Sequence, residues 1–156
     1  MSLHIVFVEP EIPSNTGNIA RTCAATNTVL HLVKPLGFSL DDKYLKRAGL
    51  DYWPFVTVEV HESFEEFLEK YKDHRMWLST TKGKQKYTDV QYQDEDMLLF
   101  GKETAGLPRP FINENIEKAI RIPMSENTRL RSFNLSNSAN IVLFEALRQL
   151  GFPDLE

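Results

Sequence analysis

A short loop with two glycines and one acidic residue is the clearest candidate for ligand chemistry in this chain. Gly101 directly follows the apolar run 97–100, Gly106 comes five residues later, and Glu103 lies between them. Glycines allow main-chain amides to approach a ligand closely, and a carboxylate supplies a charge or a hydrogen-bond acceptor. The segment has neither the paired glycines of dinucleotide-binding loops nor the closing Gly-Lys-Ser/Thr of nucleoside-triphosphate loops. It indicates a binding loop for another ligand, with a tight structural turn as the alternative.

A second polar segment joins a short strand to a long apolar helix. The strand 120–122 ends at Pro123, which has no backbone N–H to continue a strand ladder. The chain then becomes rich in Ser, Asn, Thr and Arg, and it reaches Asn134 and Ser136, two residue types that favour helix N-termini. This succession of strand, polar loop and helix caps marks the segment as the part around which the chain is organised.

The helix that follows carries more apolar surface than one sheet face usually covers. Residues on its main apolar face are Leu135, Ala139, Val142, Ala146 and Leu150, and those that widen it are Ile141, Leu143, Phe144 and Leu147. One interpretation is a central core helix. The other is a helix that packs on its own core along one side and on a partner subunit along the other.

The rest of the chain alternates apolar strands with helices. Strands are expected at residues 3–8, 29–33, 55–60, 75–79, 97–100 and 120–122. The spacing of Phe64, Phe67, Leu68 and Tyr71 predicts an amphipathic helix between the third and fourth strands. This alternation predicts one α/β domain over residues 1–156, with a mostly parallel sheet and helices on both faces. Ligands of such sheets bind beyond the carboxyl ends of the strands, which directs attention to the loops after residues 8, 78, 100 and 122.

The composition is that of an ordinary globular protein, with 42% hydrophobic and 26% charged residues. The net charge of −4 argues against a strongly basic nucleic-acid-binding protein, although it is compatible with a local basic face. No apolar run approaches the roughly 18 residues of a membrane span. The first residues lack the basic start and cleavage site of a signal peptide, so we expect a cytoplasmic location.

Cysteine and histidine usage gives little support to metal or thiol chemistry. The single cysteine, Cys23, is expected to pack inside a helix rather than to act as a nucleophile. The four histidines are scattered along the chain, and no two of them have the close spacing of a metal-binding motif: His4, His31, His61 and His74. We therefore expect no metal site.

Three stretches, taken together, resemble a known family. They are Asn15-Thr16-Gly17-Asn18-Ile19-Ala20-Arg21, the stretch from Leu99 to Leu107, and Ile122-Pro123-Met124 with Arg131-Ser132-Phe133-Asn134-Leu135-Ser136. In this order and spacing they are similar to the motifs of the SpoU branch of the SPOUT RNA ribose methyltransferases. The N-terminal stretch 6–18 and the short length are most similar to the branch that methylates the ribose 2′-hydroxyl of cytidine or uridine at tRNA position 34, the wobble nucleotide of leucine tRNAs.

The resemblance implies features that the residue pattern alone does not. The family fold is an α/β sheet whose C-terminal part is threaded as a deep trefoil knot, and its members are homodimers with the active site at the interface. The cofactor is S-adenosyl-L-methionine. By resemblance, the residues that hold the cofactor are Leu78, Ser79, Thr80, Gly101, Glu103, Gly106, Ile122, Pro123, Met124, Ser132 and Leu135.

The reaction that the resemblance implies attacks a methyl group with a weak nucleophile, a ribose hydroxyl. Orientation and an acceptor for the hydroxyl proton then supply much of the rate. By resemblance, Arg21 lies at the hydroxyl, and the residues that arrange it are Asn15, Glu103, Ser132 and Asn134. An arginine with a pKa above about 12 is a poor base. We therefore expect Arg21 first to orient the phosphate or hydroxyl, and only second to remove the proton.

RNA contacts are expected from a small set of basic residues, which are Arg21, Lys82, Lys84, Lys86, Arg129 and Arg131. For the lysines, a solvated loop is the alternative. The stretch 125–131 is longer than the usual loop of this branch, which leaves open whether Arg129 or Arg131 faces RNA phosphate.

Each candidate residue also has a purely structural interpretation. Asn15 would cap the first helix, Ser132 and Asn134 would satisfy loop backbone, and Glu103 would pair with Lys102 or an arginine. Two further functions stay open. One is 2′-O-methylation at another tRNA or ribosomal RNA site, and the other is a non-catalytic RNA-binding or assembly module with the same fold.

Overall fold

Seven parallel strands form one sheet in the computed structural model, which describes residues 2–41, 43, 47, 53–126 and 133–156. The strands are β1 (His4–Val8), β2 (Val29–Val33), β3 (Val58–His61), β4 (Met76–Ser79), β5 (Gln85–Lys86), β6 (Met97–Phe100) and β7 (Ala119–Arg121). Their order across the sheet is β3-β2-β1-β6-β4-β7-β5, and every pairing is parallel. The expectation of a mostly parallel α/β sheet is confirmed.

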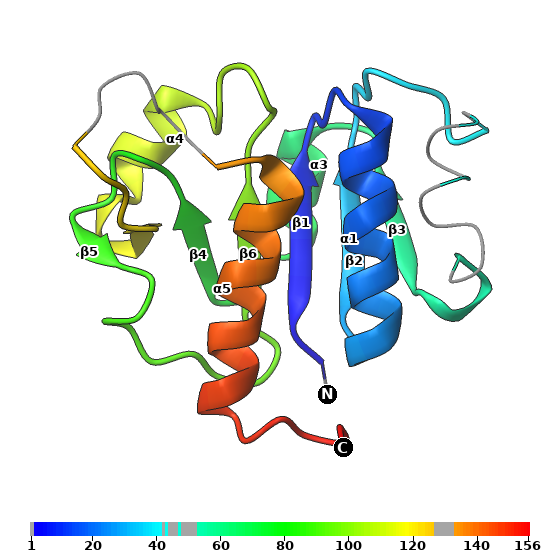
Figure 1. Cartoon of the computed structure of the whole chain (residues 1–156). Helices are drawn as coiled ribbons and strands as arrows, with labels where there is room; N and C mark the ends of the chain where they lie inside the picture. Colours follow the sequence, from blue (N-terminus) through cyan, green and yellow to red (C-terminus); the bar gives the residue numbers. More distant parts are fainter. Residues whose placement is uncertain (1, 42, 44–46, 48–52, 127–132) are drawn as a thin grey trace.

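Helices cover both faces of this sheet, as the sequence predicts (Figure 1). On one face lie α1 (Pro13–Thr26) and α5 (Leu135–Gln149), which pack against each other. On the other lie α3 (Phe64–Lys70) and α4 (Arg109–Glu114). The described part of the chain also contains two short 3-10 turns, at Trp53–Phe55 and Ile116–Lys118. Among the described residues, no helix has the length and apolarity that crossing a membrane requires.

The side chains of successive β1 residues point to opposite faces of the sheet, as in any strand. Ile5 and Phe7 belong to the core under α1 and α5, whereas Val6 and Val8 belong to the core under α3 and α4. All five residues of β1 are buried, as expected for a central strand of a parallel sheet.

A row of hydrogen-bonded histidines lies within the sheet on the α3 side. His4 Nδ1 is 2.8 Å from His31 Nε2, and His31 Nδ1 is 2.9 Å from His61 Nε2. His31 is fully buried, and this burial, together with the neighbouring charge of His4, lowers its pKa to about 3. The His31 ring is therefore neutral at physiological pH and can accept one hydrogen bond while it donates another.

Strand predictions hold best where the apolar run is continuous. Strands β2 and β6 have the expected bounds, but the third strand begins at Val58 rather than at residue 55, because Trp53–Phe55 forms a 3-10 turn. The polar segment expected to be a loop contains the short strand β5, whose backbone pairs with β7 at the sheet edge. A two-residue edge strand with polar side chains leaves no apolar alternation to read.

The start of α1 corrects one prediction. The structural interpretation of Asn15 was a helix cap, but the helix begins at Pro13, and Ile12 is its N-cap residue without a side-chain cap. Proline suits the first helical position because its missing N–H would have no partner there. Asn15 is consequently inside the helix and buried, and its side chain is available for a contact elsewhere.

Candidate active site

A cavity of about 560 Å³ lies at the carboxyl ends of the central strands, where the sequence places the ligand site. Its walls come from the loops that follow β4, β6 and β7 and from the start of α5. This volume is within the range of small-molecule sites. Apolar side chains of Phe100, Leu107 and Ile122 line it beside polar groups, so it can accept a ligand with both kinds of surface.

The glycine loop forms one wall by folding back on itself. The Gly106 N–H donates to the Lys102 carbonyl at 2.9 Å, and these two residues form an isolated antiparallel bridge. A Cβ atom on Gly101 would lie 1.9 Å from the Gly106 carbonyl carbon and 2.0 Å from the Leu107 nitrogen. Only glycine fits at position 101, and Gly106 has a φ of +73°, which other residues rarely adopt.

Glu103 joins this loop to the turn that follows β1. Its carboxylate accepts hydrogen bonds from the Glu11 N–H at 2.7 Å, the Ile12 N–H at 3.0 Å and Asn15 Nδ2 at 3.0 Å. In the opposite direction, the Glu11 carboxylate accepts from the Thr104 N–H and hydroxyl, and these bonds lower the pKa of Glu11 below its usual range. Glu103 therefore pairs with main-chain amides and Asn15, whereas the sequence suggested Lys102 or an arginine as a structural partner.

Asn15 and the start of α5 form the polar side of the cavity. Asn134 is the N-cap of α5, and its Oδ1 accepts from the main-chain N–H of Ser136 at 3.0 Å and of Asn137 at 3.3 Å. The Ser136 hydroxyl lies 2.7 Å from Asn134 Oδ1 and 3.4 Å from Asn15 Oδ1. A continuous network thus runs from Glu103 through Asn15 and Ser136 to Asn134. We call these four residues the Glu103–Asn134 network.

The residues expected to hold a cofactor mostly meet at this cavity. Those that line it are Ser79, Thr80, Gly101, Glu103, Gly106, Ile122, Met124 and Leu135. Leu78 instead packs in the core under α3 and α4, and Pro123 is exposed without lining the cavity. Ser132 lies outside the described residues.

Arg21 is exposed on α1 and does not line the cavity. Six residues of an α-helix turn through about 600°, so Arg21 points about 120° away from Asn15 around the helix axis. Of the other expected RNA contacts, Lys82 lines the cavity, while Lys84 and Lys86 are exposed nearby along the chain. Arg129 and Arg131 lie outside the described residues.

Sequence reasoning missed Ser136 as a member of the site. It was named as a helix-capping residue type and as the end of the third motif, without a role in the site, but its buried hydroxyl lies between the carboxamides of Asn15 and Asn134. The signal available in the sequence was its position two residues after Asn134, where a hydroxyl can reach the cap residue. The partner from α1 is 121 residues away and could not be anticipated.

The model of the SpoU rRNA Methylase family matches residues 2–144. The chain belongs to this family. It is 54% identical to the putative tRNA (cytidine(34)-2′-O)-methyltransferase of Bacillus subtilis strain 168, over 100% of this chain and 98% of the relative. It is 50% identical to the tRNA (cytidine(34)-2′-O)-methyltransferase of Escherichia coli K12, over 97% and 96% of the two chains.

Solved structures agree with this assignment. A protein from structural work on the 2-OH methylation of C/U34 on tRNA superposes with a TM-score of 0.91 at 42% identity, covering 96% of this SpoU family member and 97% of that chain. The fold is also shared with the SpoU methyltransferase AviRb of Streptomyces viridochromogenes, solved in complex with AdoMet. That comparison gives a TM-score of 0.81 at 23% identity, over 96% and 58% of the two chains.

Proposed function

We propose that this SpoU family member transfers a methyl group from S-adenosyl-L-methionine to the ribose 2′-hydroxyl of cytidine or uridine at position 34 of tRNA, in leucine tRNAs. The observation that carries the proposal is the Glu103–Asn134 network beside the cavity at the carboxyl ends of the strands. The names of the B. subtilis and E. coli relatives support the choice of nucleotide.

The cavity suits the proposed cofactor in both size and chemistry. Gly101 and Gly106 bring main-chain groups close to a ligand, and the apolar side chains of Leu107 and Ile122 suit an adenine ring. Ser79 and Thr80 offer hydroxyls at the end of β4. When bound, S-adenosyl-L-methionine supplies an activated methyl group on a sulfonium.

The residues of the network divide into positioning groups and groups that face the substrate. Glu103 already accepts three hydrogen bonds from Glu11, Ile12 and Asn15, so its role is to hold the two loops and the Asn15 carboxamide in place. The carboxamide nitrogen of Asn134, whose oxygen is used by the helix cap, is the donor available to a nucleotide in the cavity. Ser132 is proposed to complete this group.

Arg21 is proposed to act at the hydroxyl of a nucleotide bound to a second subunit. Its direction on α1, away from its own cavity, supports a shared site in a homodimer. Exposed apolar side chains support the same assembly, since Phe144 is 45% exposed, Ile12 45% and Phe133 43%. The guanidinium would orient the ribose or its phosphate and stabilise negative charge on the oxygen as the hydroxyl proton leaves.

A trefoil knot in the C-terminal part is also part of the proposal. It is supported by the positions of two successive elements. Strand β7 lies between β4 and β5 in the sheet, and α5, the next element along the chain, contacts β6 and α1. In this arrangement the loops after β4, β6 and β7, which line the cavity, would hold the cofactor.

RNA binding is proposed to rest on few cations, because the chain has a net charge of −4. Lys82 at the cavity and the exposed Lys84 and Lys86 would contact phosphates, together with Arg21, Arg129 and Arg131. Affinity for random RNA should consequently be weak at moderate salt, and its dependence on salt should be shallow because few phosphates are neutralised.

The deciding experiment is transfer of labelled methyl from S-adenosyl-L-methionine into bulk tRNA from cells that lack this protein, followed by nucleoside mapping. Label in 2′-O-methylated cytidine or uridine at position 34 of leucine tRNAs is the expected result. Label at another nucleotide would support the methyl-transfer reaction and contradict the proposed position of the substrate nucleotide. Bound cofactor without any transfer would overturn the enzymatic assignment in favour of an RNA-binding module.

An arginine substitution tests the assigned roles. Arg21→Ala should bind S-adenosyl-L-methionine as the wild type does, because Arg21 does not line the cavity, and should lose transfer by about two orders of magnitude or more, the usual contribution of an orienting or proton-handling group. Arg148→Ala, which removes an exposed arginine at the end of α5, is the matched control and should retain transfer. Near wild-type transfer by Arg21→Ala would refute its role.

A further inference from the structure

All four histidines of the chain gather in one place, although they are scattered in the sequence. His4, His31 and His61 form the hydrogen-bonded row described above, and the ring centroid of His74 lies 6.0 Å from that of His4. His4 and His74 lie where β1 and β4 begin, at the opposite end of the strands from the cavity, and the row runs from there across the sheet to His61 at the end of β3. A five-residue strand is roughly 16 Å long, so the two sites are separate.

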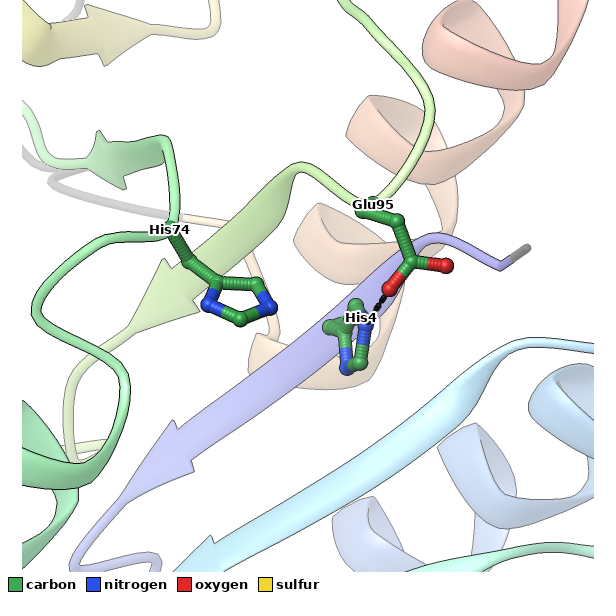
Figure 2. A group of neighbouring side chains, drawn as sticks. All are labelled: His4, His74 and Glu95. Atoms are coloured by element: carbon green, nitrogen blue, oxygen red, sulfur yellow. Dashed lines mark hydrogen bonds and ion pairs between the residues drawn. The ribbon is translucent and has the colours of Figure 1, made fainter.

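Strand order brings three residues of metal-binding types together at this edge. His4 is the first residue of β1, Glu95 comes just before β6, and His74 comes just before β4. These three strands are neighbours in the sheet, in the order β1-β6-β4. Figure 2 shows the side chains of His4, His74 and Glu95 gathered from three separate segments of the chain.

The distances suit a metal ion with imidazole and carboxylate ligands. One ligand atom from each residue lies within 4.8 Å of those from the other two, and His4 Nε2 is 3.2 Å from Glu95 Oε1. Tetrahedral zinc with bonds of about 2.0–2.1 Å places its ligand atoms about 3.3 Å apart. The His4–Glu95 pair already has this separation. His74 and Glu95 are only partly buried, so their side chains have room to adjust.

The two residues of this pair are each held by a second contact. His4 Nδ1 is hydrogen-bonded to His31, which leaves Nε2 directed at Glu95. Glu95 Oε2 accepts from the Ser2 N–H at 2.7 Å, and this bond is the main reason why the pKa of Glu95 is lowered to about 2. Groups that fix the free atom of a metal ligand in this way are a regular feature of metal sites.

The backbone at Glu95 gives independent support. Glu95 has a φ of +70° in a turn closed by the Asp96 N–H and the Gln93 carbonyl. Glycine or asparagine favours such a position, and another residue there costs on the order of 1 kcal/mol. In this turn the carboxylate of Glu95 is directed at His4, as the proposed site requires.

We propose that His4, His74 and Glu95 bind one divalent transition-metal ion of the zinc class. Two imidazoles and a carboxylate are ligands that zinc accepts, and the partial exposure of His74 and Glu95 leaves a position for water. The ion links the starts of three strands, so its role is to stabilise this end of the sheet. It does not depend on the proposed methyl transfer.

A neighbouring group of possible ligands, His31, Glu59 and His61, is less suitable. Both ring nitrogens of His31 already have histidine partners. The Glu59 carboxylate accepts from the Tyr71 hydroxyl at 2.7 Å through both oxygens and pairs with the Lys70 ammonium at 3.0 Å, so both of its oxygens already have partners. This second group therefore provides the control for the first.

The ion would also set the direction in which hydrogen bonds are donated along the histidine row. A metal on His4 Nε2 leaves the His4 proton on Nδ1, which then donates to His31 Nε2. His31 in turn carries its proton on Nδ1 and donates to His61 Nε2. Nitrogen-15 NMR of the histidine rings would report this set of tautomers directly.

The test uses the untagged full chain, freed of metal with a chelator and titrated with Zn²⁺ by calorimetry and with Co²⁺ by absorption spectroscopy. We expect one equivalent of Zn²⁺ per chain and an increase in Tm on binding. His74→Ala and Glu95→Gln should each weaken binding by more than about tenfold and abolish the metal-dependent rise in Tm. Glu59→Gln should bind within twofold of the wild type.

The Tm of each variant is first compared with that of the wild type in the absence of metal, which shows whether the variant folds. If one of the two ligand variants folds poorly, the other still tests the site. Failure of the wild type to bind a stoichiometric ion would overturn the proposal. So would binding that is unchanged in both His74→Ala and Glu95→Gln. Loss of binding in Glu59→Gln alone would also overturn it, by moving the ion to the neighbouring group.

Discussion

Asn15 Nδ2 donates a hydrogen bond to Glu103 Oε2 at 3.0 Å, across 88 residues of sequence. The bond fixes the orientation of the Asn15 carboxamide, because an ionised carboxylate only accepts and the nitrogen must face it. The Asn15 oxygen is then directed at the Ser136 hydroxyl at the start of α5. One acidic side chain thus aligns groups from two loops and two helices around the cavity.

Replacing Glu103 by glutamine should loosen this alignment while keeping the shape of the side chain. The new amide would present N–H donors to groups that are themselves donors, from Glu11, Ile12 and Asn15. We expect Glu103→Gln to lower the free energy of unfolding by about 1–3 kcal/mol, measured by urea denaturation.

The control for this change is Glu114→Gln, at the exposed end of α4, which should stay within about 0.5 kcal/mol of the wild type. Equal stability of both variants would mean that the Glu103 hydrogen bonds do not hold the two loops together.

A methyl group at Gly101 should distort the glycine loop. The added Cβ would lie 1.9 Å from the Gly106 carbonyl carbon, and main-chain atoms cannot give way as a flexible side chain can. Gly101→Ala should therefore reduce the affinity for S-adenosyl-L-methionine by more than about tenfold, which is about 1.4 kcal/mol, measured by calorimetry.

Gly151→Ala separates this effect from ordinary backbone strain. Gly151 has a φ of +80° and open space around its Cβ position, so alanine there should cost about 1 kcal/mol of stability and leave cofactor affinity unchanged. If both variants bind the cofactor equally, the close contact at Gly101 does not shape the site.

Asn134 can be tested for a role beyond capping. Asn134→Ala removes the acceptor for the Ser136 and Asn137 N–H groups and should cost about 1 kcal/mol of stability. Asn134→Asp keeps the acceptor and adds a charge that suits a helix N-terminus, so stability should return. Transfer should stay low in the aspartate variant because the carboxamide donor is lost. Full methyl transfer by a stable Asn134→Asp variant would mean that Asn134 serves only as the helix N-cap.

Cys23 should resist alkylation in the folded protein. Its side chain is buried in α1, and this burial raises the pKa of the thiol far above its usual value, so the reactive thiolate does not form near pH 8.5. In denaturant the same thiol has an ordinary pKa of about 8.5 and should react quickly. The rate of labelling with a thiol reagent, with and without urea, measures the difference. Rapid labelling without urea would show that α1 opens readily.

The elements that the sequence alone determined are those governed by local rules. Continuous apolar runs are sufficient to delimit β2 and β6, and a capping residue next to an apolar helical pattern is sufficient to begin α5 after Asn134. The three motifs identified the family, because their residues keep a fixed order and spacing along the chain. The expected site at the carboxyl ends of the strands followed from the parallel sheet itself.

Tertiary structure decided which side chains meet. Asn15 looked like a helix cap, yet Pro13 begins the helix and leaves Asn15 to pair with Glu103. The histidines looked too scattered for a common site, yet the strand order places all four together. Local patterns report the conformation of a few neighbouring residues, whereas these contacts depend on which strands lie side by side. That information is spread over the whole chain and appears only once the sheet is assembled.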